Sequence, residues 1–191
     1  MTQTHPAMRG LQTRAQLLLV PLALMWMAAA AQGLLGIELS HFGIVPRTVI
    51  GLRGILCAPF LHANLAHLLA NSAPFLILGY LVMLRRVRDF AAVSLAAILV
   101  GGAGTWLFGA AGTVHIGASG VVFGYLGFLL ARGYVERSVA AVLLSLAVAY
   151  VFGSLLWGVL PGASGVSWEG HLFGCIGGML AARALAGRAR R

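Results

Sequence analysis

Apolar residues in this chain form long runs instead of alternating with polar ones. A helix needs roughly 20 apolar residues to cross a bilayer, and six runs approach or reach that length. They predict spanning helices at Leu17–Ile37, Leu65–Leu84, Phe90–Ala111, Ala118–Ala131, Val139–Leu160 and Gly170–Ala186. The fourth is short, ends before Arg132 and suits a helix that begins below the membrane surface, in a cavity. The predicted fold class is an all-α polytopic membrane protein, a bundle of six transmembrane helices.

Composition supports a lipid environment over an aqueous one. Of the 191 residues, 60% are hydrophobic and 9% are charged, whereas soluble domains carry about 25% charged residues. The chain holds 26 glycines without a collagen period, which favours close helix packing. We expect one membrane domain at residues 17–186, a tail at 1–16 and a second tail at 187–191, with the first helix retained rather than cleaved as a signal peptide.

Arginine placement predicts the orientation. The net charge is +9, but the arginines form short clusters between apolar runs, so nucleic acid is not an expected partner. Only Arg47 and Arg53 fall on one side of the predicted bundle. The positive-inside rule then puts both termini in the cytoplasm, in what we expect to be a bacterial inner membrane. The outer segment Glu38–Asn64 is unusually apolar and is expected to lie in the membrane interface.

Polar residues inside membrane segments are costly and therefore mark candidate functional sites. Here they are His67 and Asn71, Ser119, and His171. All lie at the outer ends of the second, fourth and sixth predicted helices. We therefore expect them at a similar depth.

Ser119 lies in a Gly117-Ala118-Ser119-Gly120 turn at a predicted helix start. Free backbone N–H groups at such a start can stabilise an oxyanion, and a neighbouring base can activate the serine. Close helix packing explains the small residues equally well. His171 is the candidate base, although a histidine bonded to a neighbouring helix is the simpler interpretation of a lone residue. Phe123, four residues after Ser119, is placed to pack on the His171 ring or in ordinary core contacts.

A carboxylate is not expected to complete a triad. Asp89 and Glu136 fall on the cytoplasmic side. Glu38 and Glu169 fall outside, but Glu169 is two residues from His171 and so faces away from it on a helix. We therefore expect a Ser–His dyad.

His67 and Asn71 share a helix face, and both donate hydrogen bonds without charge. They are candidate oxyanion donors, with hydrogen bonds between helices as the alternative. His62 falls on another face and predicts no metal pair. His115 is a rival base, but we expect a solvated loop residue. With no HExxH, CxxC or zinc spacing, neither metal nor cofactor is expected.

Glycines recur along two predicted helices, at Gly120, Gly124 and Gly127 and at Gly170, Gly174 and Gly178. Small residues at this spacing permit close helix contact. If these faces meet, Ser119 and His171 come together.

Together these stretches closely resemble the rhomboid family of intramembrane serine proteases. The matching residues are Phe60-Leu-His62, His67-Leu-Leu-Ala-Asn71, Gly117-Ala-Ser-Gly120 with Val121-Val-Phe-Gly124, and His171-Leu-Phe-Gly174 with Gly178. The resemblance implies a six-helix fold with an outward-opening cavity. It implies Ser119 as nucleophile, His171 as base, and His67, Asn71 and backbone N–H groups near Ser119 as the oxyanion hole.

The function expected is cleavage of transmembrane protein substrates near the outer membrane face. Two alternatives remain: a catalytically inactive relative that binds membrane proteins, and a helix bundle that holds haem or an ion through His67 and His171.

Overall fold

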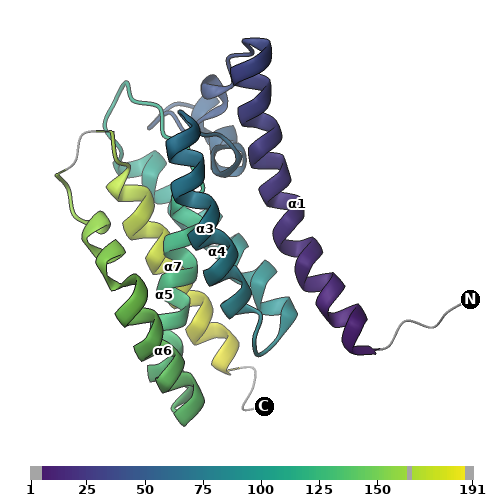
Figure 1. Cartoon of the computed structure of the whole chain (residues 1–191). Coiled ribbons are helices and arrows are strands. Elements are labelled where there is room, and N and C mark those ends of the chain that lie inside the picture. Colours follow the sequence, from purple (N-terminus) through teal and green to yellow (C-terminus); the bar gives the residue numbers. More distant parts are fainter. Residues whose placement is uncertain (1–5, 163–164, 188–191) are drawn as a thin grey trace, which may run out of the picture.

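A computed structural model describes residues 6–162 and 165–187, and these residues fold as a bundle of helices (Figure 1). Its long helices are α1 (Pro6–Leu35), α3 (Leu65–Val82), α4 (Val87–Phe108), α5 (Ser119–Glu136), α6 (Val139–Phe152) and α7 (Trp168–Gly187). Its short helices are η1 (Ser40–Phe42), η2 (Ile50–Arg53), α2 (Gly54–Cys57), η3 (Ala58–Phe60) and η4 (Gly153–Val159). The predicted all-helical fold is confirmed.

Several helix ends differ from the prediction, and α1 already begins at Pro6 instead of Leu17. The fourth predicted helix does not stop at Ala131: α5 continues to Glu136. Arg132 does not end it, because the Arg132 Nε donates to Glu136 Oε1 over 2.9 Å within the helix. The fifth predicted helix is α-helical only to Phe152 and then tightens into the 3-10 segment η4.

Four of the described helices are long and apolar enough to cross a membrane, namely Met8–Leu35, Leu65–Val82, Val87–Phe108 and Val139–Val159. Helices α5 and α7 are not apolar enough to be counted with these four. Each carries charged residues, Arg132 and Glu136 in α5 and Glu169 and Arg183 in α7. Both helices are nevertheless central, because they pack on each other and on α4.

Glycines join α5 to α7 with almost no space between the backbones. A Cβ at Gly174 would overlap the carbonyl of Gly120, and one at Gly178 would overlap the carbonyl of Gly124. The predicted meeting of the two glycine stripes is confirmed. Because the contact begins at Gly120 and Gly170, the first turns of α5 and α7 lie side by side.

Helix α1 lies at the edge of the bundle, and its first turn is at the same end as the last turn of α7 (Figure 1). It contacts α3 and η3, with hydrogen bonds from Trp26 Nε1 to Ser72 and from Gln32 to the carbonyl of His62. The segment between α1 and α3 is a compact set of short helices that packs on α4 through α2.

Large apolar side chains cover the outside of the bundle. Tyr150 in α6 is 92% exposed and Val49, before η2, is 86% exposed. Soluble proteins rarely expose contiguous apolar surface on this scale, so the bundle surface fits a lipid environment.

Candidate active site

Ser119 and His171 are in hydrogen-bond contact. His171 Nε2 lies 2.8 Å from Ser119 Oγ, although the two residues are 52 positions apart in the sequence. Each belongs to the first turn of its helix, α5 or α7, and the glycine contact described above brings those turns together. His171 is buried, with 9% of its surface exposed.

The backbone before Ser119 is fixed by two bonds that leave the next N–H available. Gly117 has φ +122°, a conformation that glycine adopts readily. The Gly117 N–H donates to the carbonyl of Ala58 over 2.9 Å, and the Ala118 N–H donates to His62 Nε2 over 3.4 Å. The Ser119 N–H has no hydrogen-bond partner among the described residues, so it is free at the positive end of α5.

Phe123 packs on the imidazole as predicted. The rings of Phe123 and His171 are stacked, with centroids 4.1 Å apart and planes inclined by 5°. Ser119 and Phe123 are four residues apart and share one face of α5, so one helix supplies the hydroxyl and the support for the ring. The imidazole is held on a face by Phe123 and at its Nδ1 edge by the carbonyl of Gly158, 2.9 Å away.

His67 and Asn71 line the same cavity as the pair. This cavity has a volume of about 700 Å³, and its walls include His67, Asn71, Ser119, Phe123 and His171. Asn71 Nδ2 donates to the His67 carbonyl over 2.9 Å, which uses one of its two N–H bonds and fixes the amide. The N–H of His67 is capped by Asn64, so the first turn of α3 is held in register.

Gly117 brings the backbone close to His67. A Cβ at Gly117 would lie 2.7 Å from the His67 ring, so only glycine allows this approach. Its N–H is already bonded to Ala58. Any role of Gly117 in binding an oxyanion or a substrate remains a prediction, and it would have to rest on the close approach of its backbone to the His67 ring.

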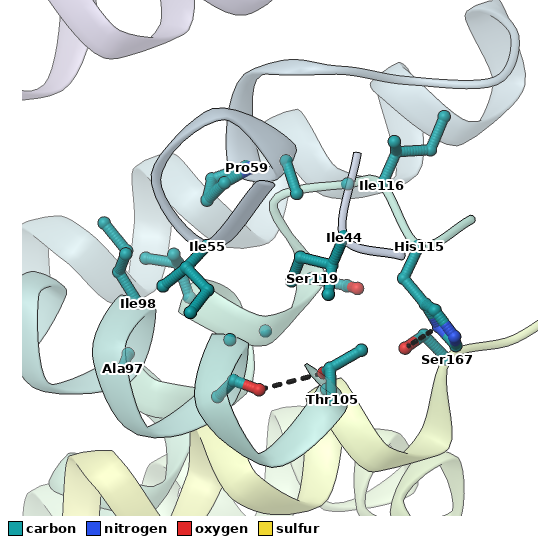
Figure 2. Close-up of a pocket in the computed structure, with 17 residues that line it drawn as sticks. Ile44, Ile55, Pro59, Ala97, Ile98, Thr105, His115, Ile116, Ser119 and Ser167 are labelled. Carbon is teal, nitrogen blue, oxygen red and sulfur yellow. Dashed lines mark hydrogen bonds between the residues drawn. The ribbon is translucent and has the colours of Figure 1, made fainter. Parts of the chain in front are cut away.

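A second, smaller pocket lies beside Ser119, between α4, α5 and the outer segment (Figure 2). Its volume is about 40 Å³, enough for ordered water but not for a large side chain. Glycines such as Gly101, Gly102 and Gly120 form part of its wall. The rest of the wall is mostly apolar and includes Ile44, Ile55 and Ile116.

His62 is a site residue that sequence reasoning passed over. Its side chain is 2% exposed, and its ring lies edge-on to that of His67 with centroids 5.0 Å apart. Burial lowers the pKa of His62 from 6.5 to about 4, and His67 adds to the effect. His62 is therefore neutral above about pH 4, and its Nε2 can then accept the hydrogen bond from the Ala118 N–H. The comparison of residues on one helix face could not place His62, because His62 precedes α3 instead of lying on it.

His115 is not the solvated loop residue that we expected. Its backbone pairs with Ile44, its Nδ1 lies 2.7 Å from Ser167 Oγ, and its Nε2 lies 2.8 Å from Thr113 Oγ1. Figure 2 shows the contact between His115 and Ser167. Both ring nitrogens are therefore engaged away from Ser119, which leaves His115 a structural link between the loops before α5 and α7.

No carboxylate forms an ion pair with His171 among the described residues. The ion pairs found among the described residues join Glu136 to Arg85 and Arg132. Glu169 is buried and borders the larger cavity, but it forms no ion pair with His171 in the described structure. No group of three or more metal-ligating side chains occurs within the described ranges.

Comparisons with known proteins identify the family of this chain. The Rhomboid domain family model matches residues 51–188. Uncharacterized proteins of Mycobacterium bovis and Mycobacterium tuberculosis are each 40% identical over 177 residues, covering 88% of this chain and 74% of theirs. An uncharacterized protein of Mycobacterium leprae is 37% identical, covering 72% of this chain and 58% of its own. The matched region runs from the outer segment through α7 and includes every residue of the candidate site, so this chain belongs to the rhomboid family.

Proposed function

We propose that this protein is an intramembrane serine endopeptidase that uses Ser119 and His171 as a catalytic dyad. The observation that carries the proposal is the 2.8 Å contact between His171 Nε2 and Ser119 Oγ at the wall of the large cavity. A serine has little nucleophilicity until a base takes its proton, and a neutral imidazole at this distance is such a base.

The reaction follows the usual course of acyl transfer. Ser119 Oγ attacks the peptide carbonyl while its proton moves to His171 Nε2, and a tetrahedral intermediate forms. The intermediate collapses, the C–N bond breaks, and His171 returns the proton to the leaving amine. Water then attacks the acyl-enzyme with His171 again as base, which releases the second product and regenerates the Ser119 hydroxyl.

Uncharged hydrogen-bond donors stabilise the developing oxyanion. We assign this role to the free N–H of Ser119, the remaining N–H of Asn71 and the ring of His67. Donors fixed before the reaction stabilise charge as it appears and need no reorganisation. The bonds from Gly117 to Ala58 and from Ala118 to His62 fix the backbone just before the Ser119 N–H.

Water access and membrane placement define the substrate class. A cavity in an apolar bundle supplies the water that hydrolysis consumes, and the surrounding apolar surface faces lipid. The substrates proposed are transmembrane proteins cleaved near the outer face. From the distribution of arginines, we place the protein in a bacterial inner membrane with both termini in the cytoplasm.

The geometry disfavours the haem or ion alternative. Both ring nitrogens of His171 are engaged, one by Ser119 and one by Gly158. Neither is then available as a ligand without breaking the pair.

A reconstitution experiment tests the proposal. The wild-type protein in liposomes should cleave a co-reconstituted transmembrane substrate with a small residue before the cut. Ser119→Ala and His171→Ala should each abolish cleavage, and the double variant should lose little more, because the pair acts as a unit. Variants of Glu38, Asp89, Glu136 and Glu169 should keep substantial turnover. An acidic residue as essential as Ser119 would contradict the dyad.

A further inference from the structure

We propose that the backbone carbonyl of Gly158 is a positioning group that fixes the tautomer of His171. This inference rests on the proposed function and concerns how the dyad is prepared without a carboxylate. In triads, an acid bonded to the second imidazole nitrogen sets both orientation and tautomer. The candidate site lacks such an acid, and the Gly158 carbonyl occupies the corresponding position.

The hydrogen-bond roles follow from the chemistry of the partners. A carbonyl oxygen only accepts, so His171 Nδ1 must carry a proton and donate it to Gly158 over 2.9 Å. A neutral imidazole holds one proton, which leaves Nε2 with a lone pair. Nε2 then accepts from the Ser119 hydroxyl over 2.8 Å. This is the tautomer that a general base requires.

The chain around Gly158 leaves this carbonyl available. Gly158 lies near the end of η4, and a further 3-10 bond to its carbonyl would have to come from residue 161. That residue is Pro161, which has no N–H. Leu160 turns into extended backbone with φ −93° and ψ 142°, so the helix ends here and the carbonyl points to His171 instead.

The stacked rings of Phe123 and His171 also require position 158 to have no side chain. A Cβ at Gly158 would lie 3.0 Å from Phe123 Cζ and 3.2 Å from His171 Nδ1. These contacts are tighter than ordinary van der Waals distances, so a side chain would push on the stacked pair. By contrast, Gly153 in the same segment η4 has no neighbouring atom within 4 Å of its Cβ position and provides a matched control.

Nitrogen-15 NMR of the full chain, labelled at histidine and held in detergent micelles, tests the tautomer directly. The His171 signals are assigned by their loss in His171→Gln. At neutral pH we expect a protonated Nδ1 and an unprotonated Nε2. A His171 protonated mainly at Nε2 would overturn the proposal, even in a fully active protease.

Variants at position 158 test the link to turnover. Complete loss of tautomer control costs about 10⁴-fold in a serine protease. We expect Gly158→Ala to lose at least roughly tenfold in kcat and Gly158→Val to lose more, with smaller changes in KM and a mixed tautomer population. Gly153→Ala should stay within about twofold of the wild type. Thermal unfolding of each variant separates these effects from misfolding.

Two further results would contradict the inference. One is a folded Gly158→Val protein with wild-type kcat and an unchanged histidine spectrum. The other is an equal loss in Gly153→Ala, which would assign the effect to η4 as a whole. Failure of Ser119→Ala to reduce cleavage would instead contradict the proposed function, and the NMR result would stand independently of it.

Discussion

The proposed oxyanion donors are the residues whose roles can be separated most cleanly from that of the proposed nucleophile. Asn71 is 5% exposed and bonded through one N–H to the His67 carbonyl, so its second N–H has a fixed direction. Such a donor contributes little to the ground state and strengthens as charge develops. Its removal should therefore lower turnover more than substrate affinity.

Asn71→Ala should lower kcat by about 10²–10³, the usual cost of one oxyanion donor. KM should change less, and Ser119 should still react with a small electrophile, because the dyad stays intact. Steady-state cleavage in liposomes gives both constants, and thermal unfolding checks the fold. A stable Asn71→Ala protein with wild-type turnover would remove Asn71 from the site.

His62 makes the stability of the fold depend on pH. Its pKa falls from 6.5 to about 4 on folding, so between these values the unfolded chain binds a proton that the folded chain does not. Stability is then full above pH 6.5 and decreases as pH falls toward 4. At about 1.4 kcal/mol per pKa unit, the loss is on the order of 3 kcal/mol.

Thermal unfolding between pH 7 and pH 4 should show this decline, and His62→Gln should flatten part of it. Part of the decline in stability should remain in His62→Gln, because burial also lowers the pKa of His115. Equal slopes in wild type and His62→Gln would show that His62 does not titrate in this window.

At the scale of elements, the α5–α7 contact sets the distance between Ser119 and His171. Neither helix could approach as closely with larger residues, because Gly174 and Gly178 face backbone carbonyls of α5. Separating the helices would move Ser119 away from His171. Packing and chemistry are therefore coupled at this contact.

Gly178→Ala should destabilise the protein by about 1–3 kcal/mol through overpacking and should also reduce turnover. Gly33→Ala in α1 is the control, because no atom lies within 4 Å of its Cβ position. It should be neutral or slightly stabilising, since alanine favours a helix by about 0.5–1 kcal/mol. Apparent Tm values in detergent make the comparison, and equal shifts in the two variants would contradict the close contact.

Much of this arrangement is readable from the sequence because it rests on residue types at fixed spacings. Apolar runs predict the long helices, polar residues at matched depth predict that Ser119 and His171 meet, and four-residue spacing places Phe123 with Ser119. The extension of α5 past Arg132 was missed because the apolar run ends there, although Arg132 and Glu136 have the i,i+4 spacing of a pair along one helix.

Groups that act through the backbone escaped prediction for a different reason. A carbonyl such as that of Gly158 exists at every position, so it carries no residue signature, and only the following Pro161 hints that it is unpaired. His62 and His115 precede helices, where helical periodicity gives no orientation. Their partners, Ala118 and Ser167, become visible only in three dimensions.

At the scale of the whole molecule, arginine placement predicts one orientation. The first turn of α1 and the last turn of α7 lie at one end of the bundle (Figure 1), as expected for termini on the same side. Ser119 and His171, in the first turns of α5 and α7, then fall near the outer face.

Topology reporters test this orientation in cells. A reporter fused after Arg191 should be active in the cytoplasm, and one inserted at Gly162–Ser167 should be active outside. The reverse pattern would place the candidate site on the cytoplasmic side and contradict the proposed depth of cleavage.

The most direct test of the serine protease assignment is covalent labelling by a fluorophosphonate. This probe bonds to an activated serine Oγ with loss of fluoride, so peptide mass spectrometry identifies the residue that reacts. We expect one adduct, on Ser119, in the wild-type protein and none at that position in His171→Ala; Ser119→Ala should remain unlabelled. A folded wild-type protein that forms no adduct at Ser119, or that labels equally well in Ser119→Ala, would contradict the assignment.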